Sequence, residues 1–324
     1  RQRQMCIRDR VSFMLSACNF YMPIFEEALD AYGLPLELRY LPIIESALNP
    51  SAVSRAGASG LWQFMIGTGK IYGLESNSLV DDRRDPIKAT WAAARYLKEM
   101  YAIYGDWNLV IAAYNCGPGT INKAIRRANG ETDYWKIYNY LPKETRGYVP
   151  AFIAANYVMT YYCDHNICPM ETNIPASTDT VQVNKNLHFE QIADLCNVPL
   201  DQVKSLNPQY KKSIIPGDNK PYTLRLPIEA ISSFIDKQDT IYAHRADELF
   251  RNRRTVAVKD VTPATRKTTT AVAGKGKLTY HTIKSGDTLS SIAGRYGVKV
   301  KDIQRWNGLS STKIAAGKRL KIYK

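Results

Sequence analysis

The sequence predicts a multidomain protein with a mainly α-helical first part, followed by two small α+β modules whose elements follow the order βααβ. Two observations favour this fold class. Apolar residues recur at helical spacing in the first half of the chain, as at Leu34, Leu38 and Leu41. Beyond residue 180 the chain repeats its own pattern one hundred residues later, which indicates one module used twice.

Two segments of the first part carry the helical pattern most clearly. The first has spacings of 4, 3, 4 and 3 between Leu34, Leu38, Leu41, Glu45 and Leu48. Such spacing predicts one face of a single helix. The second segment, residues 90–104, follows Asp85 and Pro86. We expect Asp85 to cap that helix and Pro86 to open it, because a carboxylate satisfies free amides there and proline has none.

The repeat is carried by matching residues. The first copy has Phe189, Ile192, Ala193, Val198, Val203, Asn207, Ile214 and Gly217, and the second has Leu289, Ile292, Ala293, Val298, Ile303, Asn307, Ile314 and Gly317. In the second copy, alternating residues predict strands at 280–283 and 319–322, and helical spacing predicts helices at 289–296 and 300–306.

The length of 324 residues and the 45% hydrophobic content suit two or three packed domains. No run approaches the ~18 apolar residues of a membrane span. Because the chain begins with Arg, we expect a fragment that has lost any signal sequence or membrane anchor. We expect these boundaries: 1–10, an artefact or non-native leader; 11–165, a helical domain; 166–180, a linker; 181–228, a first module; 229–277, helical and then a basic flexible linker; 278–324, a second module.

Glu45 occupies a position where the helical pattern calls for an apolar residue. A carboxyl in apolar surroundings is poorly solvated, which raises its pKa and lets it donate a proton near neutral pH. The alternative is an exposed acid at a helix end, since Pro42 disturbs the helix and Asn49 with Pro50 ends it. Downstream, Trp62 offers a face on which a sugar can stack, and Gln63 offers a hydrogen-bonding amide.

Three segments resemble motifs of the lytic transglycosylase superfamily. The first motif is a Glu-Ser pair followed by Ser and then Gly-Ala-x-Gly-Leu-x-Gln; it is matched by Glu45, Ser46, Ser54, Gly57, Ala58, Gly60, Leu61 and Gln63. Residues 113–119, AYNCGPG, resemble the Ala-Tyr-Asn-x-Gly motif of the sugar groove, and Tyr148 matches a later groove tyrosine. The resemblance implies a lysozyme-like fold for residues 11–165.

The resemblance also implies a reaction. One acid, Glu45, protonates the bond between N-acetylmuramic acid and N-acetylglucosamine and then takes the proton of the muramic 6-hydroxyl, giving a 1,6-anhydro end. By the same comparison Ser54, Gln63, Met65, Tyr114, Asn115 and Tyr148 bind the glycan, and neither a metal nor a cofactor is implied. From the residues alone, Ser54 is also compatible with a turn and Met65 with core packing.

Ordinary glycoside hydrolysis uses two carboxylates. The acids that follow Glu45 most closely are Glu75, Asp81, Asp82 and Asp85. Asp81 and Asp82 belong to the charged run DDRRD, which we expect to form a solvated loop. A goose-type-lysozyme-like hydrolase would need one of these two to activate water, and this remains the alternative enzyme. A non-catalytic peptidoglycan-binding protein is the third hypothesis.

The second module resembles the LysM domain, which binds N-acetylglucosamine chains. The resemblance implies glycan contacts from Gly286, Asp287, Thr288, Leu289 and Ile314, although Gly286 and Asp287 also suit a plain turn. The first module has Asn186, Leu187 and His188 in the corresponding positions. We therefore expect it to fold like the second module but to bind glycan weakly or to act as a spacer.

The formal net charge is +14. Residues 274–324 hold twelve Lys or Arg against two Asp, a net +10. We expect this charge to face peptidoglycan carboxylates, because no helix combines basic and base-reading residues as nucleic-acid binding requires. The resemblance places the protein, as a monomer, in the bacterial cell envelope, at the periplasm or outer membrane. Among six cysteines, Cys163 and Cys168 leave a local disulfide open, and Cys18 lies in a sequence similar to a lipoprotein cleavage site.

Overall fold

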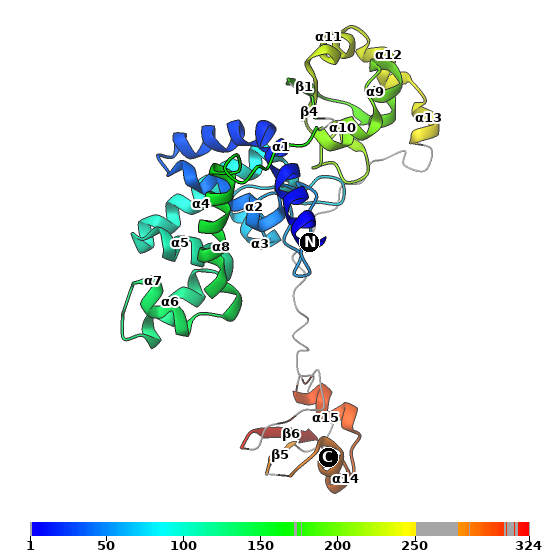
Figure 1. The fold of residues 1–324 in the computed structure, drawn as a ribbon. Coiled ribbons are helices and arrows are strands. Elements are labelled where there is room, and N and C mark those ends of the chain that lie inside the picture. The colour runs from blue at the N-terminus through cyan, green and yellow to red at the C-terminus, as the bar shows by residue number, and fades with distance from the viewer. Residues whose placement is uncertain are drawn as a thin grey trace. The chain divides into compact units, whose positions relative to one another are not determined.

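The computed structural model describes residues 2–171, 174–175, 177–250, 278–284, 286–307, 309, 314 and 317–323, with side chains from residue 8 onward. The chain divides into two compact units, Arg1–Val261 and Thr262–Lys324. Figure 1 shows the elements of both units. The basic linker expected at residues 251–277 lies outside the described residues.

The first unit begins with a helical domain, coloured blue to green in Figure 1. Its elements are α1 (Gln2–Ala31), η1 (Leu36–Tyr40), α2 (Leu41–Ser46), α3 (Ile66–Ile71), η2 (Asp82–Arg84), α4 (Pro86–Tyr104), α5 (Trp107–Cys116), α6 (Pro118–Arg127), α7 (Tyr134–Ile137), η3 (Tyr138–Tyr140) and α8 (Lys143–Thr160). Helix α4 packs against α1 and α5, and α5 packs against α8. One hydrophobic core runs through these helices.

Helix α4 begins as the sequence predicts. The Asp85 side chain accepts hydrogen bonds from the amides of Ile87 and Lys88, and Pro86 occupies the first helical position. The helix ends at Gly105, whose φ of 62° suits a residue without a side chain. Helix α5 then starts behind a second aspartate cap, Asp106. These caps fix both ends of the connection between the two central helices.

The prediction of one continuous helix through residues 34–48 is wrong. The chain forms the 3-10 helix η1 and then the short α2, which has Pro42 in its first turn. Leu38, Leu41 and Leu48 are nevertheless all buried in the same core. Both η1 and α2 pack against α8, and they also pack against each other. This packing keeps the three leucine side chains on one side, although the helix is broken.

The first module follows the helical domain. Its elements are β1 (Thr178–Val183), β2 (Asn186–His188), α9 (Phe189–Cys196), α10 (Leu200–Leu206), β3 (Ile214–Pro216), β4 (Tyr222–Pro227), α11 (Ile228–Asp236), α12 (Gln238–Ala243) and α13 (Ala246–Leu249). β1 pairs with β4 in antiparallel register, from Thr178↔Pro227 to Val183↔Tyr222. β2 pairs with β3 in a second antiparallel ladder. Three helices, α11, α12 and α13, follow β4 in turn.

The second unit contains the second module. Its elements are β5 (Leu278–Thr282), α14 (Leu289–Tyr296), α15 (Val300–Asn307) and β6 (Arg319–Tyr323). β5 and β6 pair in antiparallel register, and both helices contribute to a small core that includes Leu289, Ile303 and Leu320. The βααβ order confirms the fold class, a mainly helical domain followed by two α+β modules. None of the helices in the described residues combines the length and apolar character needed to cross a membrane.

Candidate active site

Glu45 lies in the last turn of α2, where the helix stops abruptly. Ala47 and Leu48 both have positive φ, 52° and 59°, so the chain turns directly after the helix. Leu48 folds back into the core, whereas Glu45 is half-buried. The break thus leaves the carboxyl at the boundary between core and solvent.

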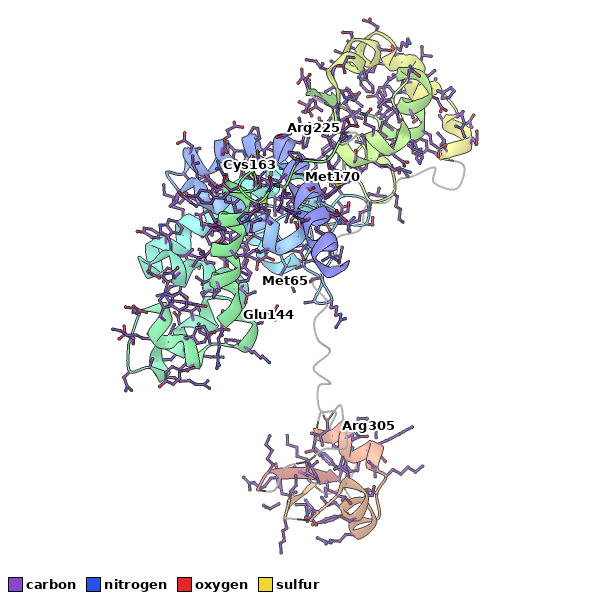
Figure 2. The ribbon with its side chains drawn as sticks, viewed as in Figure 1. Met65, Glu144, Cys163, Met170, Arg225 and Arg305 are labelled. Carbon is purple, nitrogen blue, oxygen red and sulfur yellow. The ribbon has the colours of Figure 1, made fainter. Side chains whose placement is uncertain are left out.

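The surroundings of Glu45 favour its protonated form. Burial is the main reason that its pKa rises from 4.5 to about 7. The Tyr148 hydroxyl donates a hydrogen bond to the carboxyl, which lowers the pKa. The charge of Glu144, which lies one turn before Tyr148 on α8 and is labelled in Figure 2, raises the pKa of Glu45. A carboxyl with a pKa near 7 is populated in both forms at neutral pH, so it can both give and take a proton.

Two tyrosines accompany Glu45, Tyr114 from the end of α5 and Tyr148 from α8. Burial and the charge of Glu45 raise the pKa of both hydroxyls well above the usual range. Both therefore remain protonated donors. Tyr114 donates to the backbone oxygen of Trp62 at 2.7 Å, while Tyr148 donates to Glu45.

The segment after α2 is held by hydrogen bonds of its own polar residues. Ser46 donates to the carbonyl oxygen of Leu61 at 2.9 Å, which ties the helix end to the second half of the motif. The Ser54 hydroxyl accepts from the Ala58 amide at 3.0 Å. Gln63 donates through its side-chain amide to the carbonyl oxygens of Ala52 and Gly60. Ser54 and Gln63 thus shape the loop through hydrogen bonds to its backbone.

A cavity of about 310 Å³ opens beside this loop. Its volume is within the ~300–1,000 Å³ range of small-molecule pockets. The lining residues are Trp62, Gln63, Phe64, Met65, Thr68, Tyr96, Tyr114, Asn115, Cys116, Gly117 and Pro118. Four predicted glycan-binding residues, Gln63, Met65, Tyr114 and Asn115, therefore face one space. Ser54 and Tyr148 are not among its lining residues, and Tyr148 lies instead against Glu45.

Trp62 is among the lining residues of the cavity, but its ring is buried. The side chain is 0% exposed, packs edge-on against Phe25 and donates from Nε1 to the Thr90 hydroxyl at 2.9 Å. The expectation that it stacks on a sugar is wrong, because its indole is part of the core. Met65, labelled in Figure 2, is 45% exposed, which excludes core packing as its role.

The expectation of a solvated loop at Asp81 and Asp82 is also wrong. Asp81 is 1% exposed and pairs with Arg83, itself 5% exposed, at 2.8 Å. Asp82 is buried too and pairs with Lys88 at 3.0 Å. Each carboxylate already has a cationic partner, because an unpaired charge in the core would be very costly.

Sequence reasoning missed two residues that support the site. Thr145 on α8 is buried and donates to the Asn115 side chain at 2.8 Å, so it orients one lining residue of the cavity. Arg83 donates to the backbone oxygens of Gly57 and Phe64 at 2.8 and 2.9 Å. The charged run around Arg83 was visible in the sequence, but its burial was not.

In the second module the predicted glycan contacts take part in local structure. The Asp287 carboxylate binds His281 Nε2 at 2.9 Å and the Lys284 amide at 2.9 Å. Thr288 caps α14, and Leu289 is buried in the core. Gly286 has a φ of 90°, as a turn requires, and Ile314 packs against the core. A role for these residues in glycan binding stays a prediction.

The cysteines form no disulfide within the described residues. Cys163, labelled in Figure 2, and Cys168 are both free and exposed. Cys18 lies within α1, where burial raises the pKa of its thiol to about 12. His, Cys, Asp and Glu side chains of the described residues form no group of three that could hold a metal ion.

Three family models match the chain. The transglycosylase SLT domain matches residues 22–137. The LysM-like domain of the lytic transglycosylase MltD matches residues 177–243, and the LysM domain matches residues 281–322. These matches cover the helical domain, the first module and the second module in turn.

Several relatives of the chain are named lytic murein transglycosylases. The chain is 32% identical over 294 residues to membrane-bound lytic murein transglycosylase D of Escherichia coli, covering 90% of this chain and 60% of the relative. It is 33% identical over 124 residues to the soluble lytic murein transglycosylase of the same organism, covering 36% of this chain and 19% of the relative. The crystal structure of the E. coli 70 kDa soluble lytic transglycosylase aligns with 29% identity and a TM-score of 0.38, covering 44% of this chain and 24% of that one.

The chain thus spans 60% of the length of its MltD relative. The order of the three matched domains agrees with the order of the helical domain and the two modules. Residues 22–137 belong to the transglycosylase SLT domain family, and the chain joins them to an MltD-type LysM-like domain and a LysM domain.

Proposed function

We propose that the chain is a lytic murein transglycosylase that cleaves the β-1,4 bond between N-acetylmuramic acid and N-acetylglucosamine without consuming water. The observation that carries this proposal is Glu45, a half-buried carboxyl with a pKa of about 7 whose charge acts on Tyr114, a lining residue of the cavity. Its relatives named as lytic murein transglycosylases support the same activity.

In the proposed reaction Glu45 acts first as an acid. Its protonated carboxyl gives the proton to the glycosidic oxygen as the bond from that oxygen to C1 of the muramic residue breaks. The carboxylate so formed accepts the hydrogen bond of Tyr148, which stabilises the charge. It then removes the proton of the 6-hydroxyl, whose oxygen bonds to C1 and closes the 1,6-anhydro ring. Glu45 is protonated again at the end, so one carboxyl serves both steps.

The remaining site residues would bind and orient the glycan. Gln63, Met65, Tyr114 and Asn115 line the cavity, and Ser54 would stabilise the acetamido group or the developing positive charge of the muramic residue. The LysM module would hold the same polymer through Gly286, Asp287, Thr288, Leu289 and Ile314. Peptidoglycan in the bacterial cell envelope is the substrate and partner that fits both parts.

The alternative hydrolase needs a carboxylate that activates water on the opposite face of the sugar. Asp81 and Asp82 are committed to Arg83 and Lys88. Glu144, whose charge acts on Glu45, is therefore the acid to test. If the chain is a transglycosylase, Glu144→Gln should retain the activity, with the pKa of Glu45 lowered because a like charge is removed.

Digestion of purified peptidoglycan, with the products identified by mass spectrometry, tests the proposal. We expect soluble fragments that end in 1,6-anhydromuramic acid from the wild-type chain and none from Glu45→Gln. Reducing ends would support the hydrolase, and no release by a folded wild-type chain would support a binding protein. A cooperative thermal unfolding transition of the variant provides the folding control.

A further inference from the structure

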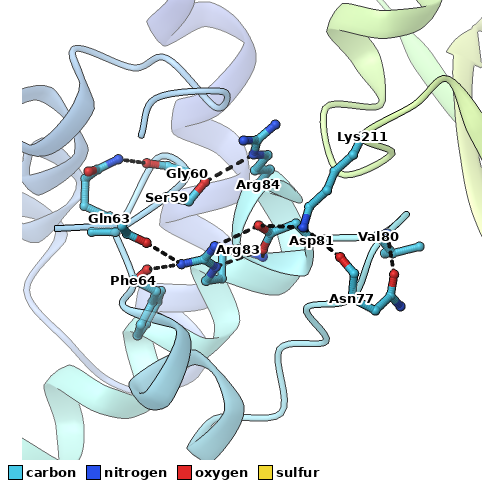
Figure 3. Close-up of polar contacts among 12 residues, drawn as sticks. Ser59, Gly60, Gln63, Phe64, Asn77, Val80, Asp81, Arg83, Arg84 and Lys211 are labelled. Carbon is cyan, nitrogen blue, oxygen red and sulfur yellow. Dashed lines mark hydrogen bonds and ion pairs between the residues drawn. The ribbon is translucent and has the colours of Figure 1, made fainter. Parts of the chain in front are cut away.

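One loop of the SLT domain, residues 75–84, lies between the catalytic motif and the first module. On the side of the motif, Arg83 Nη1 donates to the carbonyl oxygens of Gly57 and Phe64. These two oxygens belong to the two ends of the segment that contains Gln63. The guanidinium therefore holds the two ends of this segment close together; Figure 3 shows the hydrogen bond to Phe64.

Two neighbouring contacts attach the same segment to η2. Arg84 Nε donates to the Ser59 hydroxyl at 3.1 Å. Gly60 has a φ of 89° and packs so closely on Arg83 that a side chain at this position would overlap the Arg83 carbonyl. The position of η2 thus determines where the segment, and with it Gln63, can lie.

Asp81 fixes the orientation of Arg83. It accepts from Nε at 2.9 Å and from Nη2 at 2.8 Å, a two-pronged pair that leaves Nη1 directed at the motif. Burial by itself would raise the pKa of Asp81, but the hydrogen bonds and charge of Arg83 and the charge of Lys211 lower it overall. Asp81 is therefore an anion at neutral pH.

The first module binds this loop through hydrogen bonds and an ion pair. The Asp81 amide donates to the Gln209 carbonyl oxygen at 2.9 Å, and the Lys211 amide donates to the Leu79 carbonyl oxygen at 2.8 Å. Lys211 Nζ lies 3.7 Å from Asp81 Oδ2 and donates to the Asn77 carbonyl oxygen at 2.7 Å (Figure 3). Leu79 and Val80 are buried in the hydrophobic core of the module. The loop is thus shared between the two domains.

The positions of the first module that correspond to the predicted LysM glycan contacts are occupied by the module itself. β2, which holds Asn186, Leu187 and His188, is paired with β3. The Asn186 amide also donates to Asp218 at 3.0 Å. These backbone groups are therefore engaged within the module, which contacts the SLT domain through the loop at residues 75–84.

We propose that the first module positions the catalytic motif, through the contacts Lys211 to Asp81, Asp81 to Arg83, and Arg83 to Gly57 and Phe64. Lys211, Asp81 and Arg83 are positioning residues in this scheme, since none is a lining residue of the cavity. The inference rests on the proposed transglycosylase function. It assigns the MltD-type module a task in catalysis that does not require it to bind glycan.

The test compares Lys211→Met with Lys211→Arg, which restores the cation near Asp81. Lys220→Met is the matched control, because Lys220 also links the module to the loop at residues 75–84, through Glu75 at 2.6 Å, but does not pair with Asp81. Kinetics on soluble uncross-linked glycan chains should show kcat about tenfold lower for Lys211→Met, since a misplacement of about 1 Å can cost up to a hundredfold. We expect KM within about twofold of the wild-type value and recovery in Lys211→Arg.

Hydrogen exchange of the peptide that covers residues 57–64 provides a readout that does not depend on activity. Faster exchange in Lys211→Met than in Lys220→Met, at equal melting temperature, supports positioning. Unchanged kcat and exchange in Lys211→Met would overturn the inference. Equal losses of kcat and melting temperature in both Met variants would overturn it as well, because the module would then only stabilise the fold. A wild-type chain without activity, or an active Glu45→Gln, would instead refute the proposed function and leave the exchange result to decide the inference.

Discussion

Replacing Tyr148 by Phe removes the hydroxyl that donates to the Glu45 carboxyl and leaves the ring that packs beside it. This hydrogen bond stabilises the carboxylate and so lowers the pKa of Glu45, which is about 7 in the intact site. A hydrogen bond to a charged group contributes ~1.5–3 kcal/mol, and one pKa unit corresponds to about 1.4 kcal/mol. The pKa of Glu45 should therefore rise by about 1–2 units in Tyr148→Phe.

The pH dependence of kcat/KM reports this change. Because Glu45 must be protonated to act as the acid, activity falls as the pH rises through its pKa. We expect this falling limb near pH 7 in the wild-type chain and about 1–2 units higher in the variant, with a lower maximum. Release of soluble fragments from peptidoglycan, measured between pH 5 and 10 with the melting temperature as a folding control, checks the shift. A limb that stays in place or moves to lower pH would refute the assignment of Glu45 and Tyr148 to one acid-base pair.

Three further predictions concern Glu45, Gly60 and Asp85. Because the pKa of Glu45 is raised from 4.5 to about 7, ionisation of this carboxyl lowers the stability of the fold as the pH rises through about 7. In urea titrations the free energy of unfolding of Glu45→Gln should therefore equal that of the wild-type chain below pH 4.5 and exceed it by up to about 3 kcal/mol at pH 8. Gly60→Ala should destabilise the fold by more than about 2 kcal/mol, because the new methyl group overlaps the Arg83 carbonyl. Gly57→Ala places its methyl group in open space and should cost only the ~1–2 kcal/mol of a positive φ, so thermal melting distinguishes the two variants. Asp85→Ala should cost about 1 kcal/mol by loss of the α4 cap, while kcat stays at the wild-type value, and equal stability would contradict the capping role.

Patterns between near neighbours were predictable from the sequence. The Asp85 cap and the βααβ order of the second module required only local propensity and spacing. The spacing of Glu45 to Leu41 and Leu48 left both a buried and an exposed carboxyl open, and the structure makes it half-buried. Packing onto one core selects which side chains face inward, and this selection survives a break in the helix.

Features that depend on distant partners were not predictable. Asp81 and Arg83 look like residues of a solvated loop until Lys211, which binds Asn77 across 134 positions of sequence, brings the first module onto them. Trp62 points into the core because the backbone turns sharply at Gly60 and Gln63, both with positive φ. Neither a composition nor a periodicity argument includes such turns. The contact between the SLT domain and the first module was missed for the same reason.

The central claim is that one carboxyl, Glu45, acts as acid and then as base, so that no water enters the product. Digestion of peptidoglycan by the wild-type chain in water enriched in the heavy oxygen isotope tests this claim most directly. The account predicts fragments with 1,6-anhydro ends that carry no heavy oxygen, and no fragments from Glu45→Gln. Heavy oxygen at C1 of the new muramic ends would contradict it, because it would show that water, activated by a second group, had attacked the sugar.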